Sequence, residues 1–410
     1  MNTGQFQQYK TENNRAAGEF LDALKKMEAP AVVVHHNDAD GLCAAASLSK
    51  AFDILSIDYK LFPIEKIHEL ILAKIHAAYR GCVLYADLGG QSSGLIGKYS
   101  KHNSLVIILD HHLPDGEVPG NVIHLNPELF GISGDTDISG ASVSSVFAME
   151  LFRQLPAAGS SVDANLAIYG VIGAFGDRQL KDGALTGVNR IFLDRAEEQG
   201  LIQKSKGRYT LPGFGNRRIE ELVETLNLLG SIGFYSGDAQ KGIDFLMGRN
   251  QDRAIARASE LSQMKKGKFD FELKQAAESG LGKTTHFNWI DIKDRFSPMG
   301  VKAIGLFIER LIEEKIAEPD KYVIGFQHFP NSAPGIGNLN ISLSKVSARV
   351  PSGLRKEIEE KNFPDFMKLI PEATALTGGT ADGCHRFSAA SLIKRGREQA
   401  FVEALESLLS

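Results

Sequence analysis

The chain has 410 residues and a formal net charge of −4, and 43% of its residues are hydrophobic. This length indicates two domains, the composition is typical of a globular protein, and no apolar run approaches the roughly 20 residues of a membrane span. The first 200 residues hold 16 Lys+Arg against 24 Asp+Glu, which argues against a strongly basic groove for long nucleic acid. The polar N-terminus lacks a signal-peptide core, so we expect a cytoplasmic protein with no membrane partner.

The first part of the chain alternates strand and helix patterns. Strands are predicted at 31–36, 58–62, 82–88 and 104–110, and helical patterns occur within 5–27 and at 42–52 and 67–80. Continuous apolar strands separated by helices are typical of a parallel sheet that is buried on both faces.

Later segments predict a helical region and then a second body. Helices are predicted at 141–155, 164–177 and 251–279, a loop is predicted at 211–218, and a second α/β pattern begins at 285. We therefore predict an α/β fold in three parts. These parts are a parallel-sheet catalytic domain at 1–250, a helical linker at 251–282 and a smaller α/β domain at 283–410.

Acidic and imidazole side chains follow three of the predicted strands. The segment 36–41, His-Asn-Asp-Ala-Asp-Gly, follows the first strand, Asp87 closes the third, and Asp110-His111-His112 closes the fourth. Asp177 follows an apolar helix. Ligands bind beyond the carboxyl ends of the strands in an open parallel sheet, so these groups should converge on one crevice.

Such a cluster predicts bound cations. Five carboxylates would repel one another strongly without a counter-charge. Oxygen and imidazole ligands without thiolate favour manganese or magnesium over structural zinc. Two such ions suit phosphoryl chemistry, because they stabilise both the attacking and the leaving oxygen.

The motifs HHNDADG, YADLGG, ILDHHLP and GAFGD have the order and rough spacing of the DHH phosphoesterase superfamily, which the chain therefore resembles. RecJ exonucleases, nano-RNases, family II pyrophosphatases and cyclic-dinucleotide hydrolases are members. The companion C-terminal domain of that family carries a Ser-x-Arg segment and a Gly-Gly-His loop. Similar segments occur here at Ser347–Arg349 and at Gly378–His385, although five residues separate the second glycine from the histidine. The resemblance implies an active site in the cleft between the two domains.

The resemblance also implies a role for each metal ligand. One ion would be held by His36, Asp38 and Asp87, with His35 as the alternative to His36. The second would be held by Asp40, Asp87, His111 and Asp177, so that Asp87 bridges the pair. The catalytic set is His112 with Asp87 and His111, and His112 would protonate the leaving oxygen or bind substrate. We expect two Mn²⁺ ions, with Mg²⁺ as the alternative.

A second group of residues is implied to bind substrate. Arg349 and Ser347 would bind a phosphate, since a guanidinium can make two parallel hydrogen bonds to such a group. Gly378 and Gly379 would let backbone N–H groups approach an anion. His385 would contact the terminal phosphate or the base. Ser142, near the start of a predicted helix, caps it and is a candidate phosphate contact.

The resemblance implies a manganese-dependent phosphodiesterase that acts on short linear 5′-phosphorylated oligonucleotides or dinucleotides such as pGpG. A two-metal-activated water would release 5′-mononucleotides. Three alternatives stay open: a RecJ-like exonuclease on single-stranded DNA or RNA, a cyclic-dinucleotide hydrolase, and an inactive nucleotide-binding scaffold. A long-strand enzyme should show a basic channel with aromatic platforms, so the low sequence pI of about 6.3 favours the short substrate. Homo-oligomerisation is left open.

Overall fold

The computed structural model describes residues 3–27, 29–103, 105–114, 118–154, 161–360 and 362–409, without the side chains of 161–164 and 382. The described chain divides into two compact units. Unit 1 comprises residues 1–259 with 334–337, and unit 2 comprises 260–333 with 338–410. The predicted domain boundaries, and the predicted cleft between the domains, stay predictions.

Unit 1 is built on a five-stranded sheet in the order β2-β1-β3-β4-β5, and every neighbouring pair is parallel. Its strands are β1 (Ala31–His36), β2 (Tyr59–Ile64), β3 (Cys82–Ala86), β4 (Leu105–Leu109) and β5 (Val122–His124). The central strands are almost wholly buried, because helices cover both faces. The predicted parallel sheet is therefore confirmed.

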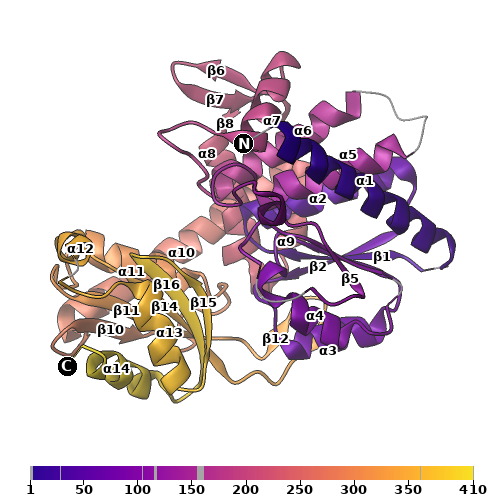
Figure 1. Ribbon diagram of the computed structural model, residues 1–410. Coiled ribbons are helices and arrows are strands. Elements are labelled where there is room, and N and C mark those ends of the chain that lie inside the picture. The colour runs from indigo at the N-terminus through magenta and orange to yellow at the C-terminus, as the bar shows by residue number, and fades with distance from the viewer. Residues whose placement is uncertain are drawn as a thin grey trace. The chain divides into compact units, whose positions relative to one another are not determined.

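Helices cover this sheet on both sides (Figure 1). On one side lie α1 (Thr3–Lys25), α2 (Ala39–Leu55), α5 (Gly140–Arg153) and α6 (Ser161–Gly176), and on the other lie α3 (Glu69–Ala78) and α4 (Ser93–Tyr99). α2 is buried around its whole circumference from Ala39 to Ser49. Its small residues permit close packing against α5 and α6, which fixes the loop that precedes α2.

The rest of unit 1 is mainly helical and carries one small sheet. Its helices are α7 (Gly187–Glu198), α8 (Ile219–Asn227) and α9 (Ala239–Leu246), and the small antiparallel sheet consists of β6 (Gln203–Ser205), β7 (Arg208–Leu211) and β8 (Arg217–Arg218). The prediction of a loop at 211–218 is therefore wrong at both ends of the range, because Leu211 of β7 pairs with Arg217 of β8. Residue 155, the last of the predicted helix 141–155, lies outside the described residues.

Unit 2 contains a mixed six-stranded sheet in the order β15-β16-β14-β11-β10-β9. Its strands are β9 (Gly282–Lys283), β10 (Phe287–Asp291), β11 (Tyr322–His328), β14 (Leu343–Arg349), β15 (Thr380–Cys384) and β16 (Ser388–Lys394). α11 (Ala303–Glu313) packs against β11 and β14, whereas α13 (Phe366–Leu376) and α14 (Glu398–Ser407) enclose an aromatic core on the sheet. The predicted second α/β body is confirmed. The helix predicted at 251–279 is α10 (Gln251–Ser279), and the division between the units falls within it.

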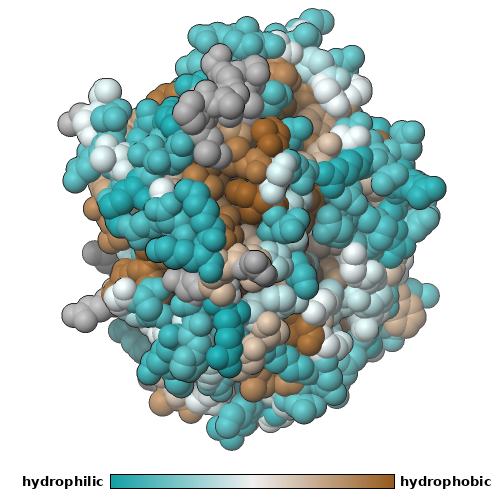
Figure 2. Space-filling model, turned by 90° about the vertical axis from the view of Figure 1, so that its right-hand side faces the viewer, coloured by the Kyte–Doolittle hydropathy of each residue, from teal (hydrophilic) through white to brown (hydrophobic). Residues whose placement is uncertain are grey.

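One face of the molecule is mainly hydrophilic. The face in Figure 2 is mostly teal, with hydrophobic residues gathered in separate brown patches. Among the described residues, none of the helices combines the length and the apolar character that crossing a membrane requires.

Candidate metal centre

The turn after β1 places two carboxylates at the carboxyl edge of the sheet. Asp38 caps α2, and its side chain accepts a hydrogen bond from the Gly41 backbone N–H at 3.1 Å. A Cβ on Gly41 would lie 2.4 Å from the His36 carbonyl oxygen. The tight turn therefore requires glycine at 41, and it directs Asp40 inward from the first turn of α2.

Asp40 is held by the N-terminus of a second helix. Its two carboxylate oxygens accept the backbone N–H groups of Gly140 at 2.8 Å and of Ala141 at 3.0 Å, in the first turn of α5. The orphan N–H groups at a helix start favour a negative charge, so α5 stabilises the ionised carboxylate. A Cβ on Gly173 would lie 2.1 Å from an Asp40 oxygen, so α6 can pass this close only with glycine there.

Asp87 follows β3 and lies at the centre of the cluster. Its backbone has φ 61°, and its N–H donates to the Leu109 carbonyl at 2.9 Å. A Cβ on Gly140 would lie 2.2 Å from an Asp87 oxygen. The start of α5 therefore touches both Asp40 and Asp87, and the glycine at 140 makes this approach sterically feasible.

The two histidines after β4 have different environments. His111 is buried, and its Nδ1 contacts the Gly134 carbonyl at 2.7 Å, which leaves Nε2 on the side of the carboxylates. His112 is 45% exposed, and its Nδ1 contacts Asp110 at 2.7 Å. A carboxylate or carbonyl on one ring nitrogen fixes the imidazole and prepares the other nitrogen for a metal or a substrate.

Asp110 was not assigned a role from the sequence, and the structure gives it a supporting one. Its carboxylate accepts the backbone N–H groups of Gly90 at 2.7 Å and of His111 at 2.8 Å, in addition to the His112 contact. Burial disfavours its charge, but His112 and these hydrogen bonds outweigh burial and hold the pKa of Asp110 well below its usual range. Asp110 is thus a fixed anion that orients His112.

Asp177 follows α6 and completes the cluster. Gln179 donates to Asp177 at 2.9 Å and to the Gly134 carbonyl at 2.6 Å, the same carbonyl that contacts His111. Asn189 in turn donates to Gln179 at 2.7 Å. These buried amides orient two members of the cluster. No sequence motif indicated them, because each acts only through tertiary contacts.

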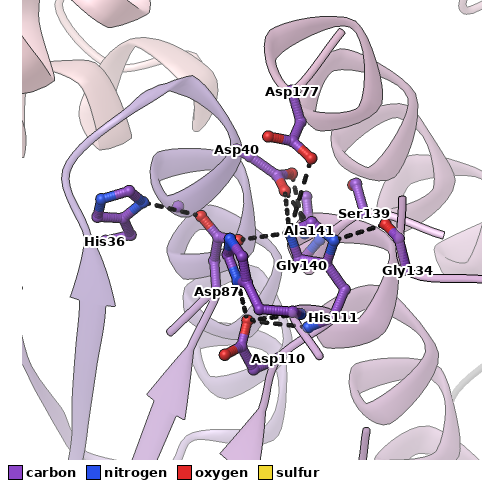
Figure 3. Close-up of polar contacts among 12 residues, drawn as sticks. His36, Asp40, Asp87, Asp110, His111, Gly134, Ser139, Gly140, Ala141 and Asp177 are labelled. Carbon is purple, nitrogen blue, oxygen red and sulfur yellow. Dashed lines mark hydrogen bonds and ion pairs between the residues drawn. The ribbon is translucent and has the colours of Figure 1, made fainter. Parts of the chain in front are cut away.

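Three overlapping groups of side chains share one neighbourhood (Figure 3), and within each group the ligand atoms lie within 4.8 Å of one another. One group contains Asp87, Asp110, His111 and His112. The two groups made of predicted metal ligands are His36, Asp38 and Asp87, and Asp40, His111 and Asp177. His36 Nδ1 lies 3.4 Å from one Asp87 oxygen, and His111 Nε2 lies 3.4 Å from the other. Asp87 therefore lies between the two groups.

The electrostatics of the cluster fit bound cations. Burial, and then the Asp177 charge, raise the pKa of Asp40 to about 6, and burial with the Asp40 charge raises the pKa of Asp87 well above its usual range. Burial would lower the pKa of His111, but contact with Asp87 and the neighbouring charges outweighs it and raises that pKa. No described residue forms a hydrogen bond of acceptable geometry with Asp87 Oδ1 or His111 Nε2, although both atoms are buried. Buried polar atoms without partners are costly, and a divalent cation would satisfy both.

The other sequence candidates in unit 1 lie differently. His35 is buried, its Nδ1 contacts the His36 carbonyl oxygen, and burial lowers its pKa to about 4. Only His36 of this pair contacts the carboxylates, at 3.1 Å from Asp38. The Ser142 hydroxyl is buried and donates to Asn189 at 2.7 Å, which favours a supporting role over contact with substrate.

Within unit 2 the candidate substrate residues fall at two ends of one hairpin. Arg349 pairs with Ser388 in the sheet, and the His385 N–H bonds the Ser388 carbonyl, so these three lie at one end. Gly378 and Gly379 precede β15, whose first residue pairs with Leu392 at the other end. The five residues between Gly379 and His385 form strand β15 and not part of a Gly-Gly-His loop. The glycines and His385 therefore do not converge.

Ser347 and Arg349 share one face of β14, next to the first turn of α11. A Cβ on Gly305 would lie 3.0 Å from Arg349 Nη2 and 3.4 Å from the Ser347 hydroxyl. Arg349 Nε donates to Glu309 at 2.7 Å and Nη1 donates to the Ala348 carbonyl at 3.0 Å. Within the described chain nothing accepts from Nη2, so that end of the guanidinium is left for a ligand.

Comparisons with known proteins place these features in a family context. Residues 30–172 match the model of the DHH family, N-terminal domain. An uncharacterised protein of Methanocaldococcus jannaschii is 31% identical over 180 residues, which are 42% of this chain. The match spans only 38% of that curated relative's length.

Solved structures are similar over nearly the whole chain. The exonuclease RecJ bound to manganese has a TM-score of 0.63 and 18% identity, covering 97% of this chain and 94% of its own. The DHH domain of a member of the s1p family of ribosomal proteins has a TM-score of 0.64 and 17% identity, covering 100% of this chain and 92% of its own. At these identities the likeness shows the fold.

Proposed function

We propose, from the match of residues 30–172 to the model of the DHH family, N-terminal domain, that this chain is a metal-dependent phosphodiester hydrolase. The superfamily assignment made from the sequence motifs is thereby confirmed. As the substrate we propose a linear 5′-phosphorylated oligonucleotide, and as the cofactor two Mn²⁺ ions.

The observation that carries this proposal is the crowding around Asp87. This buried carboxylate belongs to one ligand group and lies 3.4 Å from His111 of the other. Asp87 Oδ1 and His111 Nε2 are both buried and form no hydrogen bond of acceptable geometry among the described residues. In the proposal His36, Asp38 and Asp87 hold one cation, and Asp40, Asp87, His111 and Asp177 hold the other. Such ions, when bound, neutralise charge on a phosphate and activate water as the nucleophile.

His112 has the properties of a proton donor in this scheme. Its Nδ1 is occupied by Asp110, so Nε2 is the nitrogen available to substrate. The Asp110 charge raises the pKa of His112, which favours the imidazolium near neutral pH. An imidazolium with one nitrogen fixed and the other accessible can bind a phosphate oxygen or protonate the leaving oxygen.

The runner-up is a RecJ-like exonuclease on longer single strands, and both readings use the same metal centre. The inactive scaffold is disfavoured, because His36, Asp38, Asp40, Asp87, His111 and Asp177 are all present and grouped. A pyrophosphatase or a cyclic-dinucleotide hydrolase would use the same metal centre, but its substrate would not need a 5′-phosphate.

An assay series with Mn²⁺ tests the proposed function. We expect hydrolysis of 5′-phosphorylated dinucleotides and short oligonucleotides to 5′-mononucleotides, and loss of activity with EDTA. Equal turnover of strands of about twenty residues would favour the runner-up. Product sizes are read by chromatography. Turnover of pyrophosphate or of a cyclic dinucleotide, with none of the linear oligonucleotides, would contradict the proposed substrate class.

Arg349→Ala is expected to raise KM for 5′-phosphorylated oligonucleotides by about ten-fold with little change in kcat. A charge-assisted contact that acts mainly in binding contributes on the order of 1.5–3 kcal/mol. Initial rates over a range of substrate concentrations separate KM from kcat. Arg310→Ala is the matched control, because Arg310 lies on α11 and pairs with Glu313 and Glu314. An unchanged KM in the Arg349 variant would remove that residue from the substrate site.

A further inference from the structure

The small sheet β6–β8 concentrates positive charge within an otherwise acidic region. Residues 199–218 contain Lys204, Lys206, Arg208, Arg217 and Arg218 and not one Asp or Glu. Residues 1–200 carry more Asp and Glu than Lys and Arg, so the net charge of the whole chain does not reveal this cluster. We call the five residues with their three strands the basic sheet.

Most of this charge is exposed and unpaired. Lys204, Lys206 and Arg208 are exposed and, within the described chain, form no ion pair with a carboxylate. Lys206 occupies the hairpin turn with φ 49°, between the paired residues Ser205 and Arg208. Arg218 differs, because it pairs with Glu221 at 2.7 Å. Three like charges on one hairpin repel one another, so folding alone gives no reason to place them together.

The basic sheet packs against α6, the helix that ends just before the metal ligand Asp177. Tyr209, in the middle of β7, packs edge-on against Phe175 of α6 with ring centroids 5.7 Å apart. Phe175 precedes Asp177 by two residues, and the exposed Arg178 follows it. Lys204 Nζ lies 5.1 Å from the centroid of the Tyr209 ring. In Figure 1 the sheet lies beside α7 and α8 within unit 1.

Anchoring also orients the sheet. Cross-strand partners share a face, so Tyr209 and the wholly buried Leu211 turn toward the body of unit 1, whereas Arg208 and Arg218 lie on the opposite face. Lys204 lies at the margin, on the face of Tyr209. Cations therefore line the turn, one edge and the outer face of a sheet that packs against the helix preceding Asp177.

We propose that the basic sheet binds the phosphates of a single-stranded nucleic acid whose cleaved phosphodiester lies at the metal centre. This inference rests on the proposed function, because hydrolysis at the metal centre is what brings the strand to unit 1. A phosphodiester strand carries a charge at every residue, so a strand longer than a dinucleotide can bring further phosphates from the metal centre to the cations of the basic sheet. The local cluster thus amends the expectation from whole-chain charge, and it points to substrates longer than two nucleotides.

Binding of labelled strands tests the proposal. The probes are 5′-phosphorylated oligo-dT and oligo-U of about twenty residues, with the 5′-phosphorylated dinucleotides for comparison, measured by fluorescence anisotropy in EDTA. The test variant combines Lys204→Gln, Lys206→Asn and Arg208→Gln, and asparagine at 206 tolerates the positive φ. We expect binding weaker on the order of ten-fold, and a slope of log affinity against log salt that is smaller by about two, since each phosphate contact in a single strand contributes about 0.7.

The matched control removes three positive charges elsewhere on unit 1. Lys26→Gln, Lys98→Gln and Lys101→Gln change exposed residues near the C-terminal ends of α1 and α4, and Figure 1 shows α4 at the other end of this unit. The control should bind both strands like the wild type, and both triple variants should keep wild-type turnover of the dinucleotides. Equal affinity and equal salt slope in the two triple variants would overturn the proposal, as would a wild type that binds the long strands no better than the dinucleotides.

Comparing the affinities for oligo-dT and for oligo-U shows whether the protein prefers deoxyribose or ribose in the strand. Tighter binding in either arm, or equal binding in both, supports the inference. If the wild type binds long strands through the basic sheet but hydrolyses none of the substrates, the proposed function fails and the binding surface stands.

Discussion

Asp87→Asn is expected to reduce metal-dependent hydrolysis by about 10³-fold or more. Asp87 lies between the two ligand groups, and an amide cannot donate negative charge to either cation. Losing charge stabilisation of several kcal/mol corresponds to roughly this factor, since 1.4 kcal/mol is ten-fold in rate. Asparagine has nearly the same volume and tolerates the φ of 61°, so the fold should persist. Steady-state turnover with Mn²⁺ and calorimetric titration of Mn²⁺ measure both effects.

Asp58→Asn is the matched control for this substitution. Asp58 is exposed just before β2, so its substitution removes the same negative charge at a position away from the cluster. We expect it to keep wild-type turnover and metal binding. If Asp87→Asn retained a tenth of the wild-type rate, the two-ion centre around Asp87 would not be the site of hydrolysis.

Metal binding is expected to stabilise the protein, and the gain should grow with pH. At a concentration 100 times the dissociation constant, Mn²⁺ would add about 2.7 kcal/mol, or about 5–10 °C in Tm. The pKa of Asp40 is raised to about 6 and that of His111 is raised too, so the metal-free native state holds more protons than the unfolded chain. The stability from these protons is present at low pH and is lost as pH rises through the folded pKa values. Mn²⁺ replaces the same protons, so the Tm gain should be larger at pH 8 than at pH 5.5.

Thermal denaturation with Mn²⁺ or with EDTA at the two pH values measures this gain. Asp177→Asn provides a second reading: it removes a charge that repels Asp40, so the metal-free variant should equal or exceed the wild type in Tm while gaining less from Mn²⁺. Asp58→Asn should behave like the wild type. A Tm gain that is the same at pH 5.5 and pH 8 would show that protons and metal do not compete at these residues.

Much of the metal centre could be predicted from local sequence. Buried runs such as 31–36 and 82–86 form strands by their own composition, and parallel strands end at one edge of a sheet. His36, Asp87 and His111 follow such strands, so their convergence is a consequence of topology. Which ions and which substrate occupy the site are not fixed by that convergence.

Other features depended on distant segments meeting. Asp110 and Gln179 hold His112 and Asp177 through contacts that no motif encodes. The five residues after Gly379 form strand β15, because their backbone pairs with β16, and sheet pairing is decided by the partner strand rather than by the segment itself.

The sequence by itself determined the α/β pattern and the ligand types, because strand and helix periodicity and side-chain chemistry are local properties. Only the tertiary structure decided how closely the ligands approach. Gly140 lets α5 touch Asp40 and Asp87 at once, and this contact joins residues far apart in the chain. The same is true of charge: the basic sheet is joined to the helix preceding Asp177 only when Tyr209 packs on Phe175, whereas averaging over the sequence cancels its cations against distant carboxylates.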